Sequence, residues 1–260
     1  MNASTRGKES GGGRDSREAN RLKAADIKKI YSVFGQFVTL SLGLGTVSLR
    51  PVLELIRKDR LPEDPDRIGR MIPDLLVVMM NPGSSHPLDP HYQPRHATTP
   101  EEIDPLGERI PTRPDNTQYQ IMRILWARGL GHARVLNLSD LRETKSTRFV
   151  ALFQDLERYP KGSAHSLFSP ERTRERMIRM GQGADIPVLV GWGRHPGLLP
   201  LARQCLDTLV PERIIGVAIP GAPGLYAHPS PMMQYAKEAW VEAILAIDHP
   251  WHIASANDLV

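Results

Sequence analysis

The chain has 260 residues, of which 40% are hydrophobic and 24% are charged, and these proportions are ordinary for a globular protein. No apolar run approaches the roughly 18–20 residues that span a membrane, so no membrane partner is expected. The one cysteine, Cys205, excludes an internal disulfide framework, a cysteine-rich zinc site and a four-cysteine iron–sulfur cluster. Because the polar N-terminus also lacks the apolar segment of a signal peptide, the sequence predicts a cytoplasmic protein.

Positive charge is concentrated in the N-terminal part of the chain. Residues 1–70 carry 14 Lys and Arg against 9 Asp and Glu, a net charge of +5, whereas the remaining 190 residues carry 19 against 20, a net charge of −1. A basic N-terminal part suits a polyanionic partner such as nucleic acid. A solvated arm without a partner is the alternative.

Four segments are expected along the chain. Residues 1–20 contain mainly Gly, Ser and charged residues, which predicts a disordered basic tail. Residues 21–72 are expected to form a helical N-terminal extension and a linker, because apolar residues recur there at helical spacing, as in Ile27, Ile30, Tyr31 and Phe34. An α/β domain over 73–248 and a C-terminal tail over 249–260 complete the chain.

The segment 73–248 alternates between apolar runs and amphipathic stretches. Buried strands are predicted over 74–80, 133–138, 186–190 and 213–219. Helices are predicted over 116–128, 170–180, 197–209 and 231–246, and two of them begin with a serine cap followed by proline, Ser169-Pro170 and Ser230-Pro231. This alternation predicts a single three-layer α/β domain with a central, four-stranded, largely parallel sheet.

Polar or glycine-rich residues follow each predicted strand, which is where ligands bind in open α/β sheets. The first three ends are Asn81-Pro82-Gly83-Ser84-Ser85, Asn137-Leu138-Ser139-Asp140 and Gly191-Trp192-Gly193-Arg194-His195, and the fourth strand leads to His228-Pro229-Ser230-Pro231. Each of these residues also has a purely structural explanation. Asn81 is a common turn residue, Asn137 can hydrogen-bond to neighbouring backbone, and Ser230 can cap a helix. Read together, the four ends predict one shared pocket.

The order of these motifs resembles that of the uracil-DNA glycosylase superfamily. The Asn-Pro-Gly form at 81–83 looks like the mismatch-specific and single-strand-selective branches, and the His-Pro-Ser-Pro form at 228–231 looks like the uracil-specific and single-strand-selective branches. The resemblance covers roughly residues 73–246. It implies a uracil-DNA glycosylase-like fold and a monofunctional DNA N-glycosylase. Such an enzyme flips out a pyrimidine and hydrolyses its N-glycosidic bond, which leaves an abasic site, without a cofactor or a metal.

The resemblance also implies a role for each matching residue. Asn81 matches the residue that orients the attacking water, and His228 matches the histidine that donates to the carbonyl of the departing base. Asn137 matches the amide that hydrogen-bonds the base, with Gly83 and Ser84 beside it. Contacts to DNA are implied for four further residues, of which the last is an apolar wedge that fills the vacated base stack: Ser85, Pro229, Ser230 and Met232.

Two features bear on which base is removed. Strict uracil enzymes place a Tyr two residues after the catalytic residue, and Gly83 stands there in this chain, so the pocket has room for a larger C5 substituent. A polar insert at 84–114 either binds such a substituent or is a solvated loop, and its polar residues include His86, Asp89, His91, Tyr92, Arg95 and His96.

A C5-modified pyrimidine is therefore the expected substrate. Examples are hydroxymethyl- and glucosylated cytosine in bacteriophage DNA, and the role of the protein would then be antiviral defence. Excision of uracil or another deaminated base in repair is one alternative, and a catalytically inactive nucleic-acid-binding module is another. A monomer that acts on DNA is expected.

Overall fold

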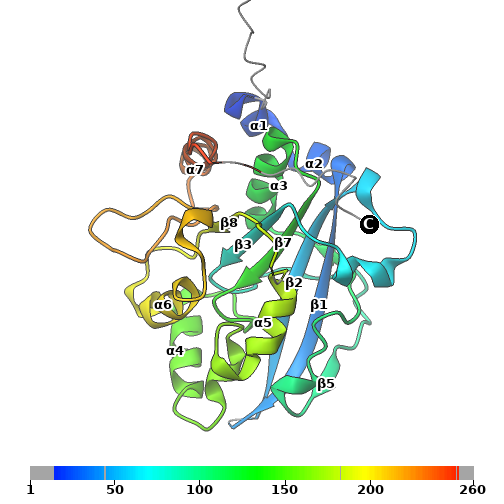
Figure 1. Ribbon diagram of the computed structural model, residues 1–260, viewed down its shortest axis with the longest axis vertical. Coiled ribbons are helices and arrows are strands. Elements are labelled where there is room, and N and C mark those ends of the chain that lie inside the picture. Colours follow the sequence, from blue (N-terminus) through cyan, green and yellow to red (C-terminus); the bar gives the residue numbers. More distant parts are fainter. Residues whose placement is uncertain (1–14, 44, 182, 250, 252–260) are drawn as a thin grey trace, which may run out of the picture.

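A computed structural model gives the positions of residues 15–43, 45–181, 183–249 and 251, and Figure 1 shows their arrangement. Within these residues the fold is mixed α/β, with one nine-stranded mixed sheet and helices against both of its faces. No helix in these ranges is long and apolar enough to cross a lipid bilayer. The expected tails, 1–20 and 249–260, fall largely outside the described residues.

The strands are ordered β4-β6-β1-β2-β7-β3-β8-β9 across the sheet, and β5 pairs with β1. β3 pairs in parallel with β7 and β8, and β8 pairs in parallel with β9. β2 lies antiparallel to both β1 and β7, so the expected four-stranded sheet is corrected to a larger and mixed one. The strand bounds are β1 Tyr31–Leu42, β2 Gly45–Arg57, β3 Leu75–Met79, β4 His86–Pro87, β5 Arg95–Ala97, β6 Ile110–Arg113, β7 His132–Asn137, β8 Val188–Val190 and β9 Ile214–Ile215.

The expected helical extension is wrong for residues 31–57. This segment forms the β1–β2 hairpin, in which Tyr31 lies opposite Arg57 and Leu42 lies opposite Gly45. Residues 49–56 of β2 are all buried. A strand covered on both faces shows no alternation of polar and apolar residues, so its sequence resembles a buried helix. The hairpin therefore belongs to the same sheet as the strands that follow it.

Helices cover both faces of the sheet. Leu75 and Val77 of β3 pack on one face with α1 (Ser16–Arg21), α2 (Ala24–Ile30), α3 (Asn116–Arg128) and α7 (Gln234–Leu245). Leu76 and Val78 point to the opposite face and pack with α4 (Ser146–Leu156) and α6 (Leu199–Leu206). The remaining helix is α5 (Thr173–Arg179), and short 3₁₀ turns cover Lys58–Arg60, Pro65–Arg70, Pro100–Glu102, Gly162–His165, Pro170–Arg172, Pro196–Leu198 and Pro211–Arg213.

Several smaller expectations are also corrected. Helix α1 occupies part of the expected disordered tail, and α4 fills a stretch for which no element was predicted. Helix α7 begins at Gln234 with Met233 at its N-cap, so Ser230 does not cap it. The fourth predicted strand shortens to Ile214–Ile215, because the following chain turns back on itself and pairs with Tyr226.

Candidate active site

A pocket of about 260 Å³ opens at the carboxyl ends of β3 and β7. Three residues predicted to contact the DNA do not line it: Ser85 and Pro229 are buried beside it, and Met232 is 93% exposed. The pocket does bring together the other six residues predicted from the strand ends, namely Asn81, Gly83, Ser84, Asn137, His228 and Ser230.

Asn81 follows β3 and is held by its amide nitrogen. Nδ2 donates to the carbonyl oxygens of Leu141 at 3.2 Å and Glu143 at 2.6 Å. Two carbonyl acceptors fix which end of the amide is nitrogen, because a carbonyl oxygen cannot donate. The Oδ1 atom of Asn81 is therefore the end that remains as an acceptor for a ligand or a water.

Asn137 is the last residue of β7, where it lies opposite Met79 of β3. Its side chain is 0% exposed, yet neither Oδ1 nor Nδ2 makes a hydrogen bond to any residue that the structure describes. Buried amides normally find partners, since an unpaired one loses its bonds to water without replacement. Asn137 therefore presents an unused donor and an unused acceptor to the pocket.

His228 enters the pocket from the loop before α7. The backbone N–H of Ser230 donates to Nδ1 of His228 at 3.1 Å, so Nδ1 is an acceptor and a neutral ring carries its proton on Nε2. Burial lowers the pKa of His228, against opposing effects of Asp115 and the Ser230 hydrogen bond. The site thus contains a neutral imidazole with an N–H donor at Nε2.

The predicted third strand end supports His228 rather than lining this pocket. A Cβ atom on Gly191 would lie 3.1 Å from Cδ of Pro229, so the missing side chain lets the His228 loop approach the sheet. The buried Trp192 donates from Nε1 to the carbonyl of Gly224 at 3.0 Å, which holds the start of the same loop.

Asp115 was not predicted, and it is a carboxylate in the pocket lining. It caps α3: Oδ1 accepts from the Thr117 N–H at 2.8 Å, and the Gln118 side chain accepts from the Asp115 N–H. Oδ2 lies 3.2 Å from the point where a Cβ atom of Gly83 would stand, so it faces the turn after β3. The spacing of Asp115 and Gln118 is that of a capping box, which indicates a helix start but not a site.

Arg50 of β2 is the second unpredicted residue of the pocket lining. It is 1% exposed, and Nε and Nη1 make no hydrogen bond to any described residue. Burial lowers its pKa to about 10, which Asp115 and Asp140 partly oppose, so the guanidinium stays charged at neutral pH. A charged residue within an apolar stretch is the sequence signal for Arg50, but this stretch was expected to be helical, so its place in the sheet was not predicted.

The polar insert 84–114 does not reach the pocket beyond Ser84. Its strands β4, β5 and β6 instead extend the sheet at β1, where the His96 ring contacts Thr39 Oγ1 at 3.0 Å and Ser41 Oγ at 3.3 Å. The expectation that polar side chains of the insert meet a base substituent is therefore corrected, as none of the six lines this pocket: His86, Asp89, His91, Tyr92, Arg95 and His96.

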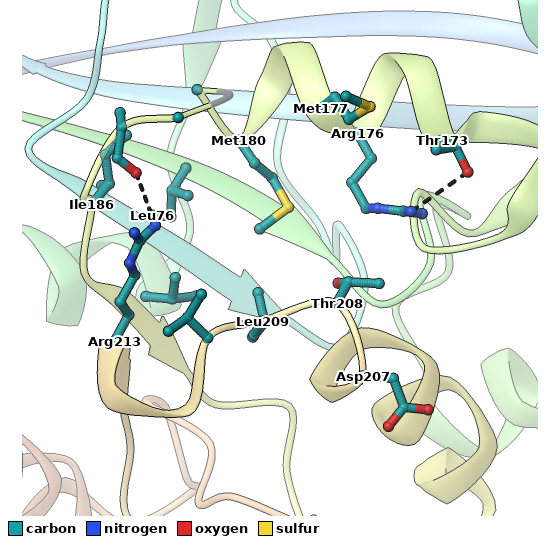
Figure 2. A pocket seen from close by; sticks show the side chains of 15 residues that line it. Leu76, Thr173, Arg176, Met177, Met180, Ile186, Asp207, Thr208, Leu209 and Arg213 are labelled. Atoms are coloured by element: carbon teal, nitrogen blue, oxygen red, sulfur yellow. Dashed lines mark hydrogen bonds between the residues drawn. The ribbon is translucent and has the colours of Figure 1, made fainter.

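Of the larger pockets, one of about 620 Å³ shares His228 with this site, and two others contain no side-chain nitrogen or oxygen atom that is buried without a hydrogen bond to a described residue. Figure 2 shows one of about 470 Å³ between α5 and the segment after α6. Its two guanidinium groups already have partners, Arg213 with the Ala184 carbonyl at 2.8 Å and Arg176 with Thr173 at 3.5 Å. No group of three or more His, Cys, Asp or Glu side chains able to hold a metal occurs in the described ranges.

No protein-family model matches this chain, and neither a curated protein nor a solved structure matches it. The function is therefore inferred from the residues of the pocket between β3 and β7.

Proposed function

We propose that this protein is a DNA N-glycosylase of the uracil-DNA glycosylase type, with the base bound in the pocket at the ends of β3 and β7. The observation that carries the proposal is the fully buried amide of Asn137, which has no hydrogen-bond partner in the part of the chain that the structure describes. Leaving a buried polar group unpaired costs about 1–3 kcal/mol, and a ligand with a matching donor and acceptor removes that cost. The edge of a flipped-out pyrimidine carries such a pair of groups.

On the base side, His228 stabilises the leaving group. The glycosidic bond breaks with its electron pair moving to the base, which departs as an anion. His228 lines the pocket, and its Nε2–H is the donor for a carbonyl oxygen of that anion, because Nδ1 accepts from the Ser230 N–H. A donor already in place where charge develops lowers the barrier.

On the sugar side, Asn81 and Asp115 hold the attacking water. Oδ1 of Asn81 is left as an acceptor, and Oδ2 of Asp115 faces the same turn. The water oxygen bonds to the sugar carbon as the base leaves, and its proton passes to the Asp115 carboxylate. The products are a free base and an abasic site, without a strand break, because no Lys or amine nucleophile takes part.

Exposed apolar side chains beside the pocket are suited to holding DNA open. Met232 and Met233 lie exposed between the His228 loop and α7, and Tyr235 lies exposed in the first turn of α7. Apolar side chains of this kind insert between base steps and fill the space that a flipped base leaves.

The proposed substrate is a C5-modified pyrimidine, with antiviral defence as the corresponding role. Gly83 and Ser84 form the wall next to Asn81, and neither carries a ring that would exclude a C5 group. Gly83 is also held at φ +64°, a conformation that L side chains rarely adopt, so this wall stays small. Uracil is the second substrate to be tested.

The test is a panel of oligonucleotides that contain uracil, 5-hydroxymethyluracil, 5-hydroxymethylcytosine or glucosylated cytosine, assayed for abasic sites. We expect release from at least one, and a rate about 10²–10³ lower in Asn81→Ala and in His228→Ala with DNA binding retained. His86→Ala is the matched control, since that exposed histidine lies outside the pocket. Absence of abasic sites across the panel would favour the binding-module alternative. Full activity in both variants would overturn the catalytic roles of Asn81 and His228.

A further inference from the structure

Arg50 is the positively charged residue of the pocket lining, and it has no ion-pair partner among the described residues. The other four buried arginines of the described residues each form an ion pair with a carboxylate. These pairs are Arg134–Glu54 at 2.8 Å, Arg109–Glu54 at 3.6 Å, Arg172–Glu175 at 2.7 Å and Arg179–Glu175 at 2.6 Å. Arg50 makes no ion pair within the described residues, and two of its three nitrogens are buried without a hydrogen bond.

An unpaired buried cation is costly for the fold. Removing a full charge from water carries a penalty of several kcal/mol, which only a close partner offsets. Asp115 and Asp140 act on Arg50 electrostatically but do not bond to Nε or Nη1. The missing partner is therefore expected from a ligand with an electron-rich oxygen.

We infer that Arg50 binds the departing base and stabilises its negative charge, so that the pocket releases poor leaving groups of the cytosine type as well as uracil. This inference rests on the proposed function. Arg50 lines the same small pocket as Asn137 and His228, so the pocket contains a full positive charge as well as the neutral imidazole donor. The electron pair of the broken bond stays on the base, and Arg50 keeps its proton throughout, because a guanidinium is not an acid at neutral pH.

The full positive charge of Arg50 should change how strongly the rate of base release depends on the stability of the departing anion. A cytosine anion is less stable than a uracil anion, so its departure requires more electrostatic help. If Arg50 supplies that help, then its removal slows the release of poor leaving groups more than that of good ones. A residue that only shapes the pocket would slow all of them alike.

The experiment measures single-turnover base release from oligonucleotides that contain 5-fluorouracil, uracil, 5-hydroxymethyluracil or 5-hydroxymethylcytosine. For Arg50→Met we expect a rate loss that grows along this series to about 10²–10³. The variant should melt at or above the temperature of the parent, because an unpaired buried charge has been removed. Arg50→Lys should recover part of the loss. Arg142→Met is the matched control, since Arg142 is half-buried, donates to the Ser85 carbonyl and does not line the pocket.

An equal loss across the series in Arg50→Met, or a growing loss in Arg142→Met, would overturn the inference while leaving the proposed function intact. If Arg50→Met does not fold, Arg50→Gln carries the same comparison. If the unaltered protein releases neither any of these four bases nor glucosylated cytosine, the proposed function fails and the inference falls with it.

Discussion

At the scale of single residues, the pocket is recognised by groups that the fold leaves without partners. Asn137 and Arg50 are both buried with unused hydrogen-bonding atoms, and Asn81 and His228 each have one polar atom fixed so that the other is free for a ligand. Protein interiors rarely retain such groups, since each one lowers stability. Their concentration in one small pocket is what separates it from the larger ones.

Replacing Asn137 with Ala is expected to affect ligand binding more than folding. No protein hydrogen bond is lost, because neither amide atom has a partner among the described residues, and the space created joins an existing pocket. Loss of two hydrogen bonds to the base should weaken binding by about 1–3 kcal/mol. Fluorescence titration with substrate DNA and thermal unfolding measure the two effects. A variant that unfolds while its folded fraction binds normally would make Asn137 a structural residue.

Some site residues follow from local sequence, and others do not. Asn81, Asn137 and His228 were predicted because each lies at a strand end or in a loop next to proline or glycine. Strand ends and such loops can be recognised from a single sequence. Arg50 lies on a strand that was expected to be helical, so its position beside β7 was not foreseen. Asp115 was missed because a helix cap and a catalytic carboxylate have the same local pattern.

At the scale of elements, β3, β7, β8 and α3 were predicted within two residues of their bounds, whereas the β1–β2 hairpin was not. The parallel strands alternate with helices, and each has polar residues at its end. The hairpin shows neither this alternation with helices nor a polar strand end. Gly43 and Gly45 at its turn lie within a long apolar stretch. Pairing over a whole sheet is a non-local property, so an apolar run alone does not distinguish a strand from a helix.

A buried charge cluster joins β2 to β7 and should contribute to the acid stability of the fold. Glu54 contacts His132 and Arg134 of β7, each at 2.8 Å, and Arg109 at 3.6 Å. Burial raises the pKa of Glu54, but Arg134 and His132 outweigh it and lower the pKa to about 2, from 4.5 for an ordinary glutamate. The ionised carboxylate therefore stabilises the fold above pH 4.5, and this contribution is lost as the pH falls from 4.5 towards 2.

The Glu54→Gln variant tests this contribution. It leaves buried cations without their partner, so the free energy of unfolding at pH 7 should fall by about 3–5 kcal/mol. The loss of stability between pH 4.5 and 2 should also become smaller than in the parent. Urea unfolding across that pH range measures both quantities. An unchanged pH dependence would show that Glu54 is not the titrating group.

The segment before α7 should matter for duplex DNA in particular. Met232 is 93% exposed, so Met232→Ala should leave the melting temperature unchanged. If its side chain holds the duplex open after base flipping, the variant should lose more activity on double-stranded than on single-stranded substrate. Met177→Ala, at another exposed methionine on α5, is the control. Equal losses of activity on both substrates would show that Met232 does not hold the duplex open.

At the scale of the whole molecule, the charge is uneven: residues 1–14 contain three basic side chains, Arg6, Lys8 and Arg14, and one acidic one, Glu9. Deleting these residues should weaken DNA binding at low salt and reduce the slope of log affinity against log salt by about 2. The deletion should stop at residue 14, because Ala19 is fully buried in α1 and Asn20 bonds to the Glu238 carbonyl at 3.3 Å. A titration with an unchanged salt slope would exclude an electrostatic role for these residues.

In the proposed complex, a base turned out of the DNA occupies the pocket between β3 and β7. The measurement that tests it most directly is a crystal structure with an oligonucleotide that carries a 2′-fluoro, hydrolysis-resistant nucleotide of the base released in the panel assay. We predict that the base lies in the pocket with its polar edge hydrogen-bonded to Asn137, at about 3 Å from both amide atoms. A base that stays stacked in the DNA, with the Asn137 amide still unpaired, would contradict this proposal.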